Sequence, residues 1–119
     1  MGLRRILLAE DEVLLRELAV EDLTDAGFEV VAARNGDAAL AVLQDDRSFD
    51  LLFTDIRMPG MLDGWALAAE AKRLIPGLKV IYSTGLNETD SGLDPTDRVI
   101  QKPYRLDALL EVIEELRTI

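Results

Sequence analysis

Five short runs of consecutive apolar residues recur along the chain, with longer amphipathic stretches between them. Runs this continuous are typical of strands that are buried on both faces of a parallel sheet. The predicted strands cover residues 5–9, 28–32, 51–53, 80–82 and 99–100. This pattern predicts a sheet that lies inside the protein and has helices packed over it.

The stretches between these runs carry apolar residues at helical spacing, and such a stripe is the face that a helix turns towards the core. The predicted stripes are Leu15, Leu18, Ala19, Leu23 and Ala26; Ala39, Leu40 and Leu43; Leu67, Ala68, Ala71, Leu74 and Ile75; and Leu106, Leu109, Leu110, Ile113 and Leu116. Alternating strands and helices predict right-handed crossovers and a sheet with helices on both faces. The predicted fold class is therefore α/β, in a single domain that covers residues 1–119.

The fourth crossover departs from this pattern. Residues 85–97 contain Gly, Asn, Thr, Asp, Ser and Pro, and only Leu86 and Leu93 are apolar. Such a segment cannot offer a wide apolar stripe, so we expect one helical turn or a mobile loop there.

The composition narrows the chemistry that the chain can perform. It has no cysteine and no histidine, which excludes disulfides, thiolate chemistry, serine-type triads and a phosphohistidine relay within this chain. Thirteen basic and 23 acidic residues give a net charge of −10, which disfavours direct binding to nucleic acids or anionic membranes. The N-terminus carries no export signal or membrane span, so a cytoplasmic location is expected.

Polar side chains follow the predicted strands at the carboxyl edge of the sheet, where ligands bind in this fold class. They are Glu10 and Asp11 after the first strand, Asp55 after the third, Ser83 and Thr84 after the fourth, and Lys102 after the fifth. Three carboxylates this close repel one another unless a cation joins them, and an oxygen-only cluster suits Mg²⁺. With Thr84 and Lys102 nearby, the edge could hold a phosphoryl group and Asp55 could act as the nucleophile.

Four short motifs carry these residues: LLAEDE at 7–12, DIRMPGMLDG at 55–64, STG at 83–85 and KPY at 102–104. Any one of them is a weak signal, whereas four in order at strand ends are specific. Together they resemble the receiver domain of two-component response regulators over essentially the whole chain. The resemblance implies a doubly wound (βα)₅ fold of five parallel strands, flavodoxin-like, with strand order 2-1-3-4-5.

The resemblance also implies how a phosphoryl group is received. Asp55 would accept it from a histidine kinase or a histidine phosphotransfer protein. Thr84 would hydrogen-bond the phosphoryl group and Lys102 would form a salt bridge with it. The peptide bond between Lys102 and Pro103 is expected to be cis, a form that only proline makes inexpensive.

The implied Mg²⁺ site consists of Glu10, Asp11 and Asp55, joined by the backbone carbonyl of Arg57. The side chain of Arg57 has two interpretations: it influences how fast the phosphoryl group is lost, or it is an exposed arginine that offsets the local acidity. Each site residue also has a structural explanation, as a helix cap, a turn residue or a surface lysine. These explanations do not account for the whole set at four strand ends.

Two features depart from the family pattern. Val99 stands three residues before Lys102, where receivers often carry Tyr or Phe, so the usual aromatic switch cannot operate. The fourth crossover is short, and the signalling face of many receivers is built around its helix. Activation is therefore expected to be read out differently. The short crossover is similar to that of stand-alone or hybrid-kinase receivers, and we expect a monomer.

The preferred hypothesis is a signalling module that catalyses only its own phosphorylation and dephosphorylation and acts on an unidentified downstream protein. One alternative is a Mg²⁺-dependent phosphatase with an aspartyl-phosphate intermediate. Such enzymes typically carry a second aspartate where this chain has Arg57. The other alternative is a receiver-like binding module that signals without phosphorylation, for which Val99 and the short crossover are the only support.

Overall fold

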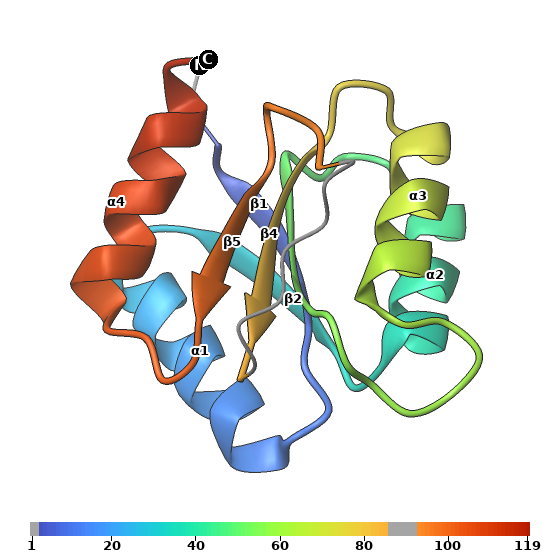
Figure 1. Ribbon diagram of the computed structural model, residues 1–119, viewed down its shortest axis with the longest axis horizontal. Coiled ribbons are helices and arrows are strands. Elements are labelled where there is room, and N and C mark those ends of the chain that lie inside the picture. Colours follow the sequence, from blue (N-terminus) through green and yellow to red (C-terminus); the bar gives the residue numbers. More distant parts are fainter. Residues whose placement is uncertain (1–2, 86–92) are drawn as a thin grey trace.

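Five strands form one parallel sheet in the order β2-β1-β3-β4-β5 in the computed structural model, which describes residues 3–85 and 93–119 (Figure 1). The strands are β1 (Arg5–Ala9), β2 (Glu29–Ala33), β3 (Leu51–Asp55), β4 (Lys79–Thr84) and β5 (Arg98–Gln101). All four pairings are parallel. The predicted strand order is confirmed, and each predicted strand lies within two residues of the observed ends.

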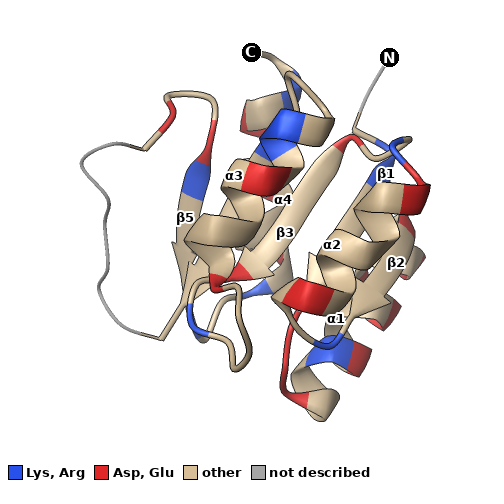
Figure 2. Ribbon diagram, turned by 90° about the vertical axis from the view of Figure 1, so that its right-hand side faces the viewer, with Lys and Arg blue, Asp and Glu red and all other residues tan. Residues whose placement is uncertain are grey.

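Four helices occur in the described part of the chain: α1 (Val13–Asp25), α2 (Gly36–Asp45), α3 (Gly64–Leu74) and α4 (Leu106–Arg117). Helices α1 and α4 cover one face of the sheet, and α2 and α3 cover the other (Figures 1 and 2). The prediction for the fourth crossover falls largely on residues 86–92, which lie outside the described residues. Residues 93–97 contain a turn and no helix.

The two cores use alternate residues of the same strands, because successive side chains of a strand point to opposite faces. Leu7 and Leu52 pack beneath α2 and α3, whereas Ile6, Leu8 and Phe53 pack beneath α1 and α4. All five residues of β3 are buried. Burial on both faces is thus confirmed for the central strands β1, β3 and β4, whereas the prediction is wrong for β2 and β5, which lie at the edges of the sheet and keep partly exposed residues.

The stripe predicted for the first helix is wrong in part. Ala19 and Leu23 are buried, but Leu15 is 38% exposed, Leu18 is 55% exposed, and Ala26 is also exposed. The reason is that α1 meets the core through Ala19 and Leu23, while Leu15 and Leu18 line an open groove between α1 and α4.

Aromatic residues fill space on both faces of the sheet. The ring of Trp65, in the first turn of α3, lies 4.3 Å from that of Tyr82 in β4. On the other face the rings of Phe53 and Tyr104 lie 5.6 Å apart in an edge-to-face arrangement. Val99 pairs with Tyr82 across β4 and β5. Within the described residues, no helix combines the length and the apolar character needed to span a membrane.

Candidate functional site

The carboxyl edge of the sheet brings the predicted residues into one place. A cleft of about 350 Å³ opens there, and its lining includes Asp11, Asp55, Arg57, Thr84 and Lys102. Topology accounts for this convergence, because all the strands are parallel and their ends therefore meet at one edge. Arg57 lines the cleft with an exposed side chain, whereas Asp55 and Thr84 are buried.

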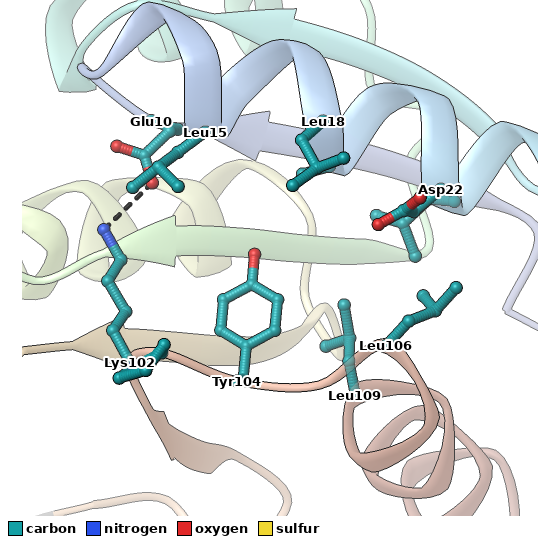
Figure 3. Close-up of a pocket in the computed structure, with 11 residues that line it drawn as sticks. Glu10, Leu15, Leu18, Asp22, Lys102, Tyr104, Leu106 and Leu109 are labelled. Carbon is teal, nitrogen blue, oxygen red and sulfur yellow. Dashed lines mark hydrogen bonds and ion pairs between the residues drawn. The ribbon is translucent and has the colours of Figure 1, made fainter.

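Glu10 is held by contacts from three directions. Its backbone N–H donates to the carbonyl of Ala33 at 3.1 Å, which extends the β1–β2 pairing beyond the strands. Its carboxylate accepts from the backbone N–H of Glu12 at 3.0 Å and from Nζ of Lys102 at 2.9 Å. The last contact is the dashed line in Figure 3. A buried carboxylate is thereby fixed at the edge of the cleft.

Asp55 is the last residue of β3, and its two carboxylate oxygens differ in their surroundings. Oδ1 accepts a hydrogen bond from Oγ of Ser83 at 2.8 Å and lies 2.6 Å from Nζ of Lys102. Among the described residues, no hydrogen-bond donor reaches the buried Oδ2. An oxygen in this position is suited to a ligand that the polypeptide itself does not supply.

Lys102 links the site together from the far strand. Its ammonium group pairs with both Glu10 and Asp55, and its backbone N–H donates to the carbonyl of Thr84 at 2.7 Å. The peptide bond between Lys102 and Pro103 is cis, as expected. A single cation thus bridges two carboxylates that would otherwise repel each other.

The electrostatics of the cluster follow from burial and crowding. Burial, together with the neighbouring carboxylate of Glu10, raises the pKa of Asp55 to about 7 against the contact with Lys102. Burial would also raise the pKa of Glu10, but hydrogen bonds from Asp55, the backbone of Glu12 and Lys102 outweigh it and lower that pKa. Burial would lower the pKa of Lys102, but Asp55 and Glu10 outweigh it and raise that pKa. One cation is therefore too few for this group of carboxylates.

The donor set fits a hard divalent cation. Glu10, Asp11 and Asp55 can each offer one oxygen, and these three oxygens lie within 4.8 Å of one another. Oxygen-only ligands of this kind suit Mg²⁺, which binds through few carboxylates and keeps several waters. The free Oδ2 and the raised pKa of Asp55 both indicate that this carboxylate lacks positive charge.

Two residues that position the site were given no individual role by the sequence analysis, which placed Ser83 at this edge of the sheet and Gly64 only within the motif at 55–64. Ser83 pairs with Asp55 across β3 and β4, and its hydroxyl donates to that carboxylate. Gly64 begins α3 against the backbone of Asp55, where an added Cβ would lie 2.1 Å from the Asp55 carbonyl oxygen. The contact of Ser83 with Asp55 could be predicted once β4 is aligned with β3, because the two residues are paired in that register. No local feature of the sequence indicates that Gly64 lies against the backbone of Asp55.

The family model for the response regulator receiver domain matches residues 6–114. The chain belongs to this family. Receiver domains act in two-component signalling, interact with histidine kinases or phosphotransfer partners, and bind Mg²⁺ at an acidic cluster. In this receiver domain the acidic cluster is formed by Glu10, Asp11 and Asp55.

Relatives of similar length and longer relatives both occur. The chain is 39% identical to the response regulator receiver protein CpdR of Brucella abortus, over 96% of this chain and 97% of that protein. It is 35% identical to the response regulator receiver protein Anae109_2439 of an Anaeromyxobacter species, covering 92% of this chain and 47% of that protein. The chain thus spans about half the length of some curated relatives.

Solved structures give the same result. A response regulator receiver protein from Sinorhizobium medicae superposes with a TM-score of 0.87 at 32% identity, covering 97% of this chain and 94% of that one. The receiver domain of the hybrid histidine kinase CckA superposes with a TM-score of 0.80 at 30% identity, covering 94% of this chain and 97% of that one. The predicted family and fold are both confirmed.

Proposed function

We propose that this receiver domain accepts a phosphoryl group on Asp55 from a phosphohistidine of a histidine kinase or phosphotransfer protein. The observation that carries the proposal is the setting of Asp55. Its buried carboxylate lies on a cleft, 2.6 Å from the ammonium of Lys102 and beside two further carboxylates. One ammonium group does not neutralise three neighbouring carboxylates, so this site favours the binding of a cation, which can then attract a phosphoryl group.

In the proposed step, a carboxylate oxygen of Asp55 forms a bond to phosphorus while the phosphorus–nitrogen bond of the donor breaks. The electron pair of that bond stays with the imidazole nitrogen of the donor, which takes up a proton from solvent. Lys102, already at Asp55, would pair with the phosphoryl oxygens, and the hydroxyl of Thr84 would donate to them from the end of β4. Ser83 orients the nucleophile through its hydrogen bond to Oδ1.

Glu10, Asp11 and Asp55, with the backbone carbonyl of Arg57, would hold the Mg²⁺ ion. The ion would supply the positive charge that lets phosphoryl oxygens approach three carboxylates. The domain would catalyse only its own phosphorylation and dephosphorylation. Residues 1–119 would form one receiver domain, monomeric and cytoplasmic, that acts on an unidentified downstream protein.

Intact mass spectrometry after incubation with Mg²⁺ and acetyl phosphate tests the assignment. We expect one added phosphoryl group in the wild type, none in Asp55→Ala, and one in the control Asp45→Ala, which changes an exposed aspartate at the end of α2. Labelling of Asp55→Ala at the wild-type rate would contradict the assignment. So would an unlabelled wild type after treatment with both acetyl phosphate and a phosphorylated phosphotransfer protein.

A further inference from the structure

The loop between β3 and α3, residues 56–63, borders the phosphoryl cleft and has little burial to hold it. Ile56 is buried, but five of the seven residues 57–63 are exposed. One of them is Arg57, which lines the cleft and whose backbone carbonyl is a proposed ligand of Mg²⁺. A loop with few buried contacts depends on specific hydrogen bonds to keep a single conformation.

Both ends of this loop are fixed by the elements that it joins. The backbone N–H of Ile56 donates to the carbonyl of Ser83 at 3.0 Å, and the carbonyl of Ile56 accepts from the N–H of Gly64 at 2.8 Å. Asp63 caps α3 by accepting from the N–H of Ala66 at 2.8 Å. The middle of the loop is held by a different element, the beginning of α2.

Helix α2 meets the loop through a carboxylate and two close backbone approaches. Oδ2 of Asp37 accepts a hydrogen bond from the backbone N–H of Met61 at 3.1 Å. Gly60 has a φ of +108°, which favours glycine, and a Cβ there would lie 2.8 Å from the same oxygen. A Cβ on Gly36 would lie 2.6 Å from the carbonyl oxygen of Leu62. The two glycines thus let α2 approach closely enough for Asp37 to hold the loop.

A simpler explanation for Asp37 is its place in the first turn of α2, where an acidic side chain interacts favourably with the helix dipole. That role requires a negative charge but no particular partner, whereas Asp37 accepts from one N–H of the loop. The cap of α2 is made by Asn35, whose side chain accepts from the N–H of Ala38 at 2.8 Å. The beginning of α2 therefore does not depend on Asp37 for its cap.

We propose that Asp37 is a positioning residue for the metal site, holding the loop so that the carbonyl of Arg57 stays at the cleft where Mg²⁺ would bind. This role rests on the proposed function, in which that carbonyl is a ligand of the ion. Arg57 lies between two fixed points of the chain, Ile56 and Met61. Without Asp37, binding of the ion would have to order this segment, so the affinity for the ion would fall.

The affinity of the full chain for Mg²⁺ tests the proposal. Urea unfolding at increasing Mg²⁺ concentrations gives the dissociation constant from the rise in the free energy of unfolding above the value in EDTA. A side chain that only stabilises the fold changes the value in EDTA and leaves this rise unaltered. Asp37 is exposed, so Asp37→Ala should fold, which circular dichroism checks.

We expect Asp37→Ala to raise the dissociation constant for Mg²⁺ by about three- to tenfold, the factor that corresponds to one hydrogen bond. Asp37→Asn keeps an oxygen acceptor without the charge and should stay within about twofold of the wild type. Asp45→Ala removes one charge from the other end of α2, roughly 12 Å along the helix, and should also stay within about twofold because salt screens exposed charges at that distance.

Unchanged Mg²⁺ affinity in Asp37→Ala would overturn the proposal. Equal weakening in Asp37→Ala and Asp37→Asn would also overturn it, because the effect would then belong to the lost charge and not to the hydrogen bond. A wild type that Mg²⁺ does not stabilise would contradict the metal site and the role of Asp37 together. Phosphorylation of Asp55 is measured separately by mass, so a failure of the proposed function and a failure of the role of Asp37 give different results.

Discussion

Asp55→Asn should change how the stability of the metal-free domain depends on pH. The substitution keeps the shape of the side chain and removes its ionisation. Burial and the carboxylate of Glu10 raise the pKa of Asp55 from 3.8 to about 7 in the folded protein. A raised carboxyl pKa means that the folded state holds a proton that the unfolded chain has already lost, so stability falls as pH rises between these two values.

The size of the effect follows from that window. Between pH 5 and pH 8 the unfolded chain carries an ionised aspartate throughout, whereas the folded protein loses its proton near pH 7. At about 1.4 kcal/mol per pKa unit, the two units between pH 5 and the pKa of Asp55 should lower the free energy of unfolding by about 2.7 kcal/mol across this range. Glu10, whose pKa is lowered, and Lys102, whose pKa is raised, keep their charges between pH 5 and pH 8 and add no slope. The chain has no histidine to titrate there.

Urea unfolding in EDTA, followed by the fluorescence of the single tryptophan Trp65 and by circular dichroism, measures this slope. Between pH 5 and pH 8 we expect the midpoint of the wild type to fall by about 1–2 M more than that of Asp55→Asn. Burial also raises the pKa of Asp97, but the slope from that group is common to both proteins. Asp45→Asn changes an exposed aspartate and should follow the wild type. Parallel pH profiles for the wild type and Asp55→Asn would refute the electrostatic reasoning.

Three further predictions concern the metal and the frame of the site. Mg²⁺ at about 100 times its dissociation constant should raise the free energy of unfolding by about 2.7 kcal/mol in thermal or urea melts. Asp11→Ala should abolish most of that rise, because Asp11 offers one of the three oxygens of the acidic cluster. Gly64→Ala should destabilise the fold by about 1–3 kcal/mol in urea unfolding and should slow phosphorylation, because the added Cβ would clash with the backbone of Asp55. In the control Gly85→Ala, the added Cβ would meet no atom within 4 Å among the described residues, so little stability should be lost. Asp97→Ala should lower the free energy of unfolding by about 1–3 kcal/mol, because it leaves the buried N–H of Val80 in β4 without its acceptor. The control Asp94→Ala changes an exposed aspartate and should lower it less in the same assay; equal losses would contradict this account.

The sheet could be predicted from the sequence because strands buried on both faces appear as continuous apolar runs, as residues 51–53 do within β3. The surface of α1 could not be predicted in the same way. Leu15 and Leu18 share helical spacing with the buried Ala19 and Leu23, yet both remain exposed. Spacing identifies the residues that share a face of a helix, but burial also requires a neighbouring element to cover them. No described element covers Leu15 and Leu18, which instead line an open groove.

The candidate site was predictable to the extent that it depends on topology. In a parallel sheet, a residue that directly follows a strand lies at the shared carboxyl edge, and this placed Glu10, Asp55 and Lys102 together. The parts that the sequence did not reveal depend on register and on close approach. Ser83 reaches Asp55 because β3 and β4 pair in that register, and Gly64 matters because α3 begins against the Asp55 backbone. The ends of the strands thus determine which groups meet. The strand register and the placement of α3 determine how the carboxylate of Asp55 is oriented and how completely it is buried. Burial in turn raises the pKa of Asp55 and creates the need for a cation.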